Sequence, residues 1–294
     1  MKESDSHFSG KELNKLIAQR RRIFLIGIPS IICLLGVIFY LYAKGFEVNT
    51  FVGAIIVLFT LLPIVLIGNY SSAVTDAAYD IIADNTDWEI YYEDSKFRII
   101  NYSYQNLIQE FGLLPESGHV KFQNHLEGEI ENRKFILQDI SWVAPKRTRT
   151  GKRDDDVARY SLLITDNTFQ INCNILIKKN TILKWGIKKL ERIKIEDKEF
   201  EKYYDVYTDA PAIALGVLNP EFIKNLLYHK KVRKNMAEIL ITPETVFVHQ
   251  KSIESEERLN WNIFIPPMEL CRKKIEHINS RLNILQLLNL LNNK

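Results

Sequence analysis

The sequence predicts an α+β fold, in which a hairpin of two transmembrane helices precedes a mostly antiparallel β-sheet domain with flanking helices and a long C-terminal helix. Three patterns lead to this prediction: two uncharged apolar runs near the N-terminus, period-two alternation of apolar and polar residues in the middle, and helical periodicity at the end. A chain of 294 residues exceeds one small domain. We therefore expect an N-terminal helix over residues 1–22, a membrane hairpin over 23–70 and an α+β domain over 71–294.

The first apolar run, Ile23 to Ala43, contains no charged residue. At a rise of ~1.5 Å per residue, it is long enough to cross about 30 Å of hydrocarbon. A short polar break follows, and a second uncharged run predicts another span over about 48–69. A signal peptide would have a shorter apolar core, of ~7–15 residues. A buried core hairpin seldom has two uncharged runs of this length, so a membrane hairpin is the preferred interpretation.

The positive charges predict the orientation of this hairpin. Six Lys or Arg residues precede the first span, namely Lys2, Lys11, Lys15, Arg20, Arg21 and Arg22. The connecting loop has only Lys44. Because positively charged flanks stay in the cytoplasm, the N-terminus and the domain after the second span are expected there, with the short loop outside.

A stripe of three carboxylates follows the second span, where helical character continues to about Asp84. Asp76, Asp80 and Asp84 recur every four residues and so share one side of the helix. Like charges at this spacing repel each other. A solvated face is the simplest interpretation, and a docking stripe for a basic surface or a cation is the alternative.

The middle of the chain predicts an antiparallel sheet with one buried face and one solvated face. The expected strands lie at 119–124, 126–130, 134–143, 160–164, 169–177, 192–195, 203–207, 238–241, 246–249 and 261–265. Turns are expected near Glu131 and Pro243. The charged segment from Pro145 to Asp156 has no apolar periodicity and is expected to be an exposed, mobile loop.

Three helices are expected beside this sheet. A short one covers about Tyr104 to Phe111, and another begins at Pro220 with Asn219 as its cap. The third runs from about Met268 to Leu291. Its apolar positions fit a core helix that covers the sheet, or alternatively a self-association seam, although a coiled coil needs three to four sustained heptads.

No motif for catalysis or cofactor binding is evident. A phosphate-binding glycine loop and a nucleophile elbow are both missing from the sequence. The three cysteines have no paired spacing, so we expect neither disulfides nor a thiolate metal site. His125, Glu127 and Glu129 would share one strand face, which is more often a solvated face than a metal or acid–base cluster. We therefore expect no cofactor and no catalytic residues.

Charge is unevenly distributed after the hairpin. Residues 70–144 hold 13 acidic and 5 basic side chains, whereas residues 145–294 hold 27 basic and 19 acidic ones. The densest basic run consists of Lys178, Lys179, Lys184, Trp185, Lys188, Lys189, Arg192 and Lys194. This run fits an anionic lipid surface, or a solvated edge that pairs within the protein. Nucleic acid is not expected as a partner, because no recognition motif accompanies the charge.

The stretch from Lys188 to Tyr228 resembles a bacterial family known as Domain of Unknown Function 3137. The matching elements are Leu190-Glu191, Glu196-Asp197 before Phe200, Val206-Tyr207, and Pro220 with Phe222. The segment from His125 to Ile140 is similar to the glycine-containing hairpin of that family. The resemblance covers about residues 70–265, although Ala210-Pro211-Ala212-Ile213 departs from the polar stretch expected there. It implies a two-span membrane hairpin and no catalytic residues.

Taken together, these patterns predict a multi-pass protein of the bacterial inner membrane, whose N-terminus and C-terminal domain are cytoplasmic. The expected role of that domain is interaction or scaffolding. The alternative is a membrane-tethered enzyme with a dispersed active site. The lipid bilayer is the one partner that the sequence specifies; the protein partner and the oligomeric state are not specified.

Overall fold

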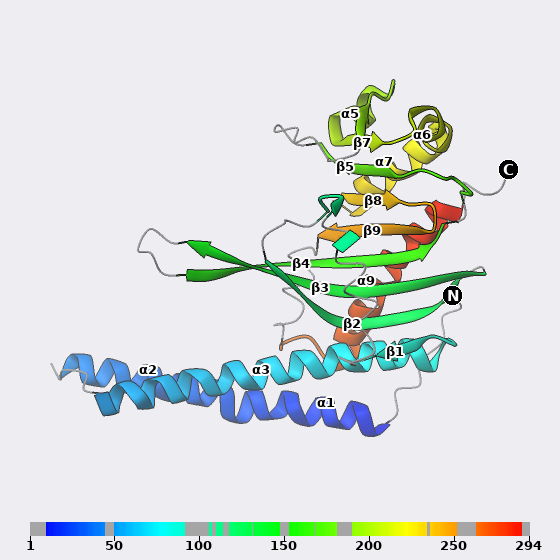
Figure 1. Cartoon of the computed structure of the whole chain (residues 1–294). Coiled ribbons are helices and arrows are strands. Elements are labelled where there is room, and N and C mark those ends of the chain that lie inside the picture. The colour runs from blue at the N-terminus through cyan, green and yellow to red at the C-terminus, as the bar shows by residue number, and fades with distance from the viewer. Residues whose placement is uncertain are drawn as a thin grey trace. The chain divides into compact units, whose positions relative to one another are not determined.

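The computed structural model confirms the α+β class (Figure 1). It describes residues 10–44, 50–91, 106–107, 110–113, 118–130, 132–147, 153–167, 169–180, 190–233, 236–251 and 263–289. The chain forms two compact units. The helical unit comprises residues 1–86 and 254–277, and the sheet unit comprises residues 87–253 and 278–294.

The helical unit begins with one long run of helix. It consists of α1 (Gly10–Arg22), the π-helical turn η1 (Ile23–Gly27) and α2 (Ile28–Ala43). The N-terminal helix therefore continues directly into the first apolar run. The π turn has a local cause. Pro29 has no N–H, so it cannot donate to the carbonyl four residues earlier. Just before it, the Ile28 N–H donates to the Ile23 carbonyl, five residues back, which is the π-helical pattern.

The second long helix, α3 (Thr50–Asp84), passes through Pro63 and ends at Asp84, as predicted. Its C-terminal half packs on α1 and on the segment around α9 in an apolar cluster, whose buried members are Leu16, Ile23, Tyr70, Val74, Ala77, Ile81, Ile263, Leu270 and Cys271. Two helical stretches, Leu13–Leu41 and Leu61–Asp84, are long and apolar enough to cross a membrane.

The sheet unit contains a nine-stranded sheet among the described residues, in the order β1-β2-β3-β4-β9-β8-β5-β7-β6, and every neighbouring pair is antiparallel. The strands are β1 (Glu89–Tyr91), β2 (His119–Ile130), β3 (Arg133–Arg147), β4 (Arg153–Asp166), β5 (Ile175–Lys179), β6 (Glu191–Ile193), β7 (Tyr204–Thr208), β8 (Ala237–Ile241) and β9 (Thr245–Lys251). The predicted turn between β2 and β3 is confirmed, and Asn132 adopts a left-handed φ of 62° there.

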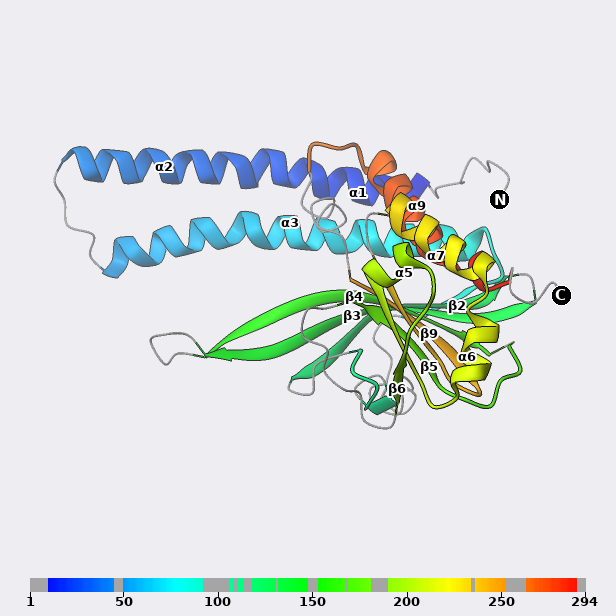
Figure 2. The ribbon, with the colours of Figure 1, turned by 90° about the horizontal axis from the view of Figure 1, so that it is seen from above.

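Four helices complete the described structure: α5 (Lys198–Tyr203), α6 (Pro211–Val217), α7 (Pro220–Arg233) and α9 (Pro267–Asn289). The Asn219 side chain accepts a hydrogen bond from the Phe222 N–H at 3.0 Å, which confirms the predicted cap of α7. Helix α7 and the end of α9 lie on one face of the sheet (Figure 2). Ile278, Leu282 and Leu285 of α9 are buried.

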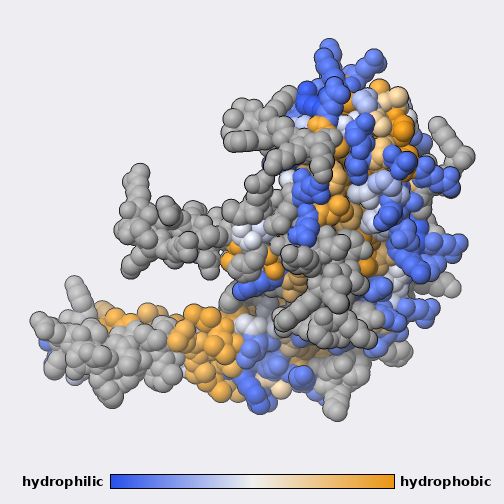
Figure 3. Space-filling view, viewed as in Figure 1, coloured by the Kyte–Doolittle hydropathy of each residue, from blue (hydrophilic) through white to orange (hydrophobic). Residues whose placement is uncertain are grey.

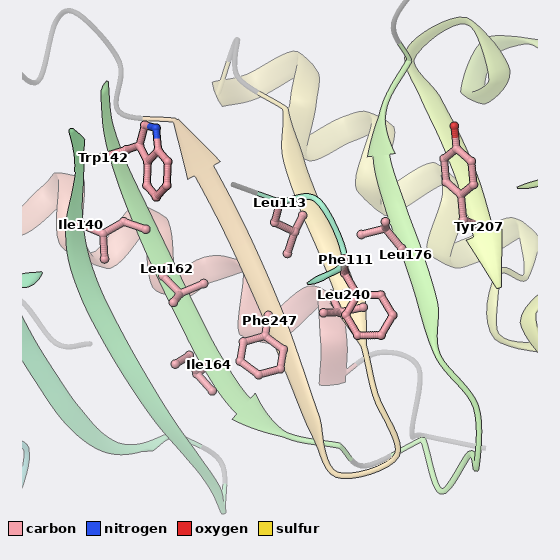
Figure 4. Packing of buried hydrophobic residues seen from close by; sticks show 10 residues of the cluster. All are labelled: Phe111, Leu113, Ile140, Trp142, Leu162, Ile164, Leu176, Tyr207, Leu240 and Phe247. Carbon is pink, nitrogen blue, oxygen red and sulfur yellow. The ribbon is translucent and has the colours of Figure 1, made fainter. Parts of the chain in front are cut away.

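The opposite face of the sheet carries a second apolar core, which a short segment at 110–113 covers (Figure 4). Phe111 and Leu113 from this segment pack on alternate strand residues, namely Ile140, Trp142, Leu162, Ile164, Leu176, Tyr207, Leu240 and Phe247. Apolar burial of about 25 cal/mol per Å² makes such a cluster a main source of stability. Of the helix predicted over 104–111, residues 106, 107 and 110 are helical, Phe111 lies in a turn, and 104, 105, 108 and 109 lie outside the described residues.

Three local predictions are wrong. Residues 169–174 form no strand, and β5 begins only at Ile175. Much of the predicted loop from Pro145 to Asp156 is a strand ladder, in which Pro145 pairs with Asp155 and Lys146 with Asp154; residues 148–152 lie outside the described part. The strand expected at 261–265 is a turn at Ile263–Ile265, and residues 261 and 262 lie outside the described part.

Candidate functional site

A row of polar side chains crosses the sheet on the face that residues 110–113 cover. On five of the six strands, alternation places them two residues from a member of the apolar cluster, and on β6 Arg192 lies opposite Tyr207 of that cluster. Six side chains form this polar row, in spatial order Arg192, Asp205, Lys178, Glu238, His249 and Tyr160, from strands β6, β7, β5, β8, β9 and β4. Positive and negative charges alternate from Arg192 to Glu238, so each charge lies beside an opposite one.

Arg192 and Asp205 form the first pair of the polar row. The Arg192 Nε donates to Asp205 Oδ1 at 2.7 Å, and its Nη2 lies 2.6 Å from the same oxygen and 3.6 Å from Glu201 Oε2. Asp205 is only 2% exposed. Burial opposes the charge of the guanidinium, but Asp205 and then Glu201 hold the pKa of Arg192 above its ordinary value. A buried carboxylate requires such a partner.

Glu238 and His249 form the second pair. They are directly opposed on β8 and β9, and 3.4 Å separates Glu238 Oε2 from His249 Nδ1. The Lys179 N–H donates to the other carboxylate oxygen at 3.2 Å. Burial alone would raise the pKa of Glu238, but the hydrogen bond and charge of His249, followed by the charge of Lys178, lower it below its ordinary value.

The imidazole of His249 is enclosed. Its ring stacks on Tyr160 with 4.4 Å between ring centroids, and its side chain is 3% exposed. Its Nε2 has no hydrogen-bond partner among the described residues. The ring of His249 on β9 therefore contacts a side chain from each neighbouring strand, Tyr160 of β4 and Glu238 of β8.

Lys178 joins the polar row to the covering segment. Its ammonium donates to the Gly112 carbonyl, between the buried Phe111 and Leu113. Gly112 has a φ of +68°, a conformation that glycine adopts without strain. Lys178 therefore holds the turn that covers this face of the sheet. Its positive charge lies between the carboxylates of Asp205 and Glu238 in the polar row.

The predicted basic run is divided by the structure. Lys178 and Arg192 point into the polar row, so they pair within the protein. Lys179 and Lys194 are exposed. The remaining members, Lys184, Trp185, Lys188 and Lys189, lie outside the described residues.

The predicted acidic stripe lies on the last turns of α3. Asp76 and Asp80 are half-buried and Asp84 is exposed. Asp76 is within electrostatic range of Asp80 and of Lys15 on α1. The stripe is thus only partly a solvated face, because its first two carboxylates are drawn into the helical unit.

His125, Glu127 and Glu129 do not form one site. His125 is buried, with Nδ1 2.9 Å from Gln138 Oε1 and Nε2 3.4 Å from Glu127 Oε2, and burial is the main cause that lowers its pKa. The expected solvated face is therefore wrong for His125, whereas Glu127 and Glu129 are exposed. Among the described residues, no three His, Cys, Asp or Glu side chains are grouped to hold a metal ion.

The sequence analysis does not single out the pair of Glu238 and His249, although the register of the predicted hairpin indicates it. The two strands were predicted as a hairpin around Pro243. Counting outward from that turn places Glu238 opposite His249, and facing residues of a hairpin share a side of the sheet.

An apolar surface forms the second candidate site, on the helical unit. Large apolar side chains are exposed along η1 and α2 and at the middle of α3, for example Leu25 at 64% and Phe39 at 73%. The other exposed members are Ile26, Ile31, Ile32, Leu35, Val37, Ile38, Tyr40, Leu61, Leu62, Ile64 and Val65. Figure 3 shows apolar residues gathered along the helices. Contiguous apolar surface on this scale marks a contact with membrane or protein.

Comparison with known proteins supports the resemblance found in the sequence. Residues 161–290 match the family model described as Protein of unknown function (DUF3137). This match confirms the predicted family resemblance over the second half of the chain, and it includes every member of the polar row except Tyr160. The description of the family assigns no activity.

One solved structure is similar over much of the chain. It is the crystal structure of the mycobacterial trehalose monomycolate transport factor A, TtfA, with 9% sequence identity and a TM-score of 0.39. The alignment covers 73% of this chain and 95% of that chain. None of the curated proteins matches.

Proposed function

We propose that this chain is a membrane-tethered interaction protein, in which α2 and the first half of α3 span the bilayer and the sheet unit binds a protein partner in the cytoplasm. The observation that carries this proposal is the apolar surface of α2, where side chains such as Phe39 are largely exposed. In water these side chains would be unfavourably hydrated, at about 25 cal/mol per Å². Acyl chains would remove that cost.

Length and charge support a spanning arrangement. The uncharged run from Ile23 to Ala43 covers about 30 Å as a helix. Arg20, Arg21 and Arg22 end α1 immediately before it. The positive-inside rule then favours a cytoplasmic N-terminus and a multi-pass topology, with the sheet unit on the same side. In a bacterium, which the family resemblance favours, this membrane is the inner one.

The ribbon of β3 and β4 supports an interaction role for the sheet unit. These strands stay paired as far as Arg147 and Arg153. By contrast, β2 ends its pairing with β3 at Val143, and β9 ends its pairing with β4 at Tyr160. Among the described residues, the ribbon beyond these points has no neighbouring strand on either edge. Unpaired strand edges accept an added strand from a partner.

The polar row favours a structural role over catalysis. Its charges are paired with each other, and Lys178 is engaged by the covering segment. An enzyme with a dispersed site gains no support from these contacts, so interaction is the function that the geometry favours.

Labelling of the native cysteines tests the tether. Cys33 is exposed on α2, whereas Cys173 and Cys271 are buried, and burial raises the pKa of the Cys271 thiol to about 12. In membrane vesicles, a water-soluble maleimide should label none of the three until the protein is denatured. Rapid labelling of Cys33 in intact vesicles would contradict the proposal, because lipid should shield it.

A photo-crosslinking amino acid at Asp155 tests whether the ribbon of β3 and β4 binds a protein partner. In cells, it should join the ribbon to a protein partner, while the same group at Glu244, exposed in the turn between β8 and β9, should not. Equal crosslinking at both positions, or none at Asp155, would contradict a docking role for the ribbon.

A further inference from the structure

The helical unit contains a turn that is well placed to meet a membrane surface. This turn, Ile263–Met268, comprises the residues before α9 and the first two residues of that helix. One guanidinium of α1 holds it: Arg20 donates from Nε to the Ile263 carbonyl at 2.9 Å and from Nη2 to the Phe264 carbonyl at 3.0 Å. Hydrogen bonds from a charged donor are stronger than neutral ones.

Aromatic contacts add to this attachment. The Phe24 and Phe264 rings meet edge to face with 5.9 Å between centroids, and the Arg20 guanidinium lies 5.5 Å from the Phe24 ring. Ile263 is buried in the apolar cluster of the helical unit. The turn is therefore fixed at the level where α1 becomes η1.

That level has a specific meaning in a membrane helix. The charged side chains of α1 end at Arg22, and the uncharged run begins at Ile23. Lys and Arg at this boundary occupy the headgroup layer on the cytoplasmic side. With α2 spanning the bilayer as proposed above, a turn docked on Arg20 and Phe24 lies at the headgroup layer.

The turn directs apolar side chains outward. Phe264 is 72% exposed although it follows the buried Ile263, and Met268 is also exposed. Arg21 and Arg22, which follow Arg20 at the end of α1, are exposed and positively charged. Exposed apolar side chains docked at the end of a helix that carries basic residues fit the boundary between acyl chains and anionic headgroups.

We propose that the turn Ile263–Met268 is an interfacial membrane anchor, which inserts Phe264 and Met268 among anionic lipids. This proposal rests on the proposed spanning of the bilayer by α2. It extends that function, because it gives the start of α9 its own contact with the membrane surface. The chain segment after the sheet strands is then attached to lipid as well as to α1.

Photo-crosslinking to lipid tests this anchor on the full-length protein in vesicles of phosphatidylethanolamine and phosphatidylglycerol. A benzophenone amino acid replaces Phe264 in one variant, Phe39 in a second and Tyr228 in a third. All three side chains are similarly exposed, at 72%, 73% and 68%. Phe39 lies in the proposed span, and Tyr228 lies on α7 of the sheet unit.

Lipid adducts, measured by mass spectrometry, should form at positions 264 and 39 and be scarce at 228. Adducts at 39 without adducts at 264 would overturn the anchor and leave the tether intact. Adducts at neither position would overturn both proposals. Equal yields at 264 and 228 would also overturn the anchor, because any exposed aromatic residue would then reach lipid.

Discussion

Glu238 and His249 face each other across β8 and β9, with 3.4 Å between Oε2 and Nδ1. They lie in the middle of a polar row that crosses six strands of the sheet. Such a row stabilises the sheet only while its charges remain paired, because an unpaired buried charge is costly. The stability of the sheet unit should therefore depend on pH and on each partner.

The Glu238→Gln variant tests the pH dependence. Because the folded state lowers the pKa of Glu238, its contribution to stability is present above the unfolded pKa of ~4.3 and is lost as pH falls through the folded pKa. Near neutral pH the variant should lose roughly 1–3 kcal/mol. The deficit should shrink as pH falls below about 4.

Thermal unfolding of the detergent-solubilised protein across this pH range provides the measurement. Glu244→Gln, at an exposed turn position, is the matched control and should behave like the wild type. A deficit for Glu238→Gln that grows on acidification would contradict the assignment.

The Asp205→Asn variant tests the other end of the polar row. It leaves Arg192 with Glu201 as its remaining carboxylate partner, at 3.6 Å. Breaking a buried pair costs about 3–5 kcal/mol, but Arg192 is partly exposed, so a loss of roughly 1–3 kcal/mol is expected. Lys194→Gln, an exposed position on the same segment, should change stability by less than about 0.5 kcal/mol. Equal unfolding midpoints for the two variants would argue against the ion pair.

Gly128→Ala tests a close approach between β2 and the residue before β1. A Cβ on Gly128 would lie 2.3 Å from the Trp88 ring, which packs edge to face on Phe135 at 4.9 Å and donates from Nε1 to the Glu129 carbonyl. Displacing the ring should cost about 1–3 kcal/mol and alter tryptophan fluorescence.

Gly216→Ala is the matched control for that change. Gly216 lies in α6, where a Cβ would meet nothing within 4 Å. Alanine there should be neutral or stabilise the helix by up to about 1 kcal/mol. The two substitutions should therefore differ in their effect on stability, and a Gly128→Ala variant as stable as Gly216→Ala would refute the packing described for Trp88.

Much of the sheet could be predicted from the sequence, because alternation and turn residues are local signals. The hairpins of β2 with β3 and of β8 with β9 are confirmed. The absence of a strand at 169–174 has a physical reason: polar side chains accept hydrogen bonds from backbone N–H groups of this segment, which are then not available for pairing with a neighbouring strand. Asn167 accepts from the Phe169 N–H at 2.8 Å, and Asp209 accepts from the Asn174 N–H at 2.9 Å.

The polar row was harder to predict from the sequence, because its members come from six strands whose order in the sheet is not the order in the chain. A single hairpin predicts one facing pair. Placing Lys178 between Asp205 and Glu238 requires the crossover that sets β5 between β7 and β8. The missed helix α5 had a readable signal, since Asp197 caps it by accepting from the Phe200 N–H at 2.8 Å.

The central claim, that two helices cross the membrane and leave the sheet unit inside, is tested most directly by thiol accessibility in intact cells. The variants Asn49→Cys and Thr150→Cys are made in a background without native cysteines. An impermeant maleimide should label position 49 at once and position 150 only after the membrane is opened. Labelling of position 150 in intact cells, or protection of position 49, would contradict the topology and with it the cytoplasmic role proposed for the sheet unit.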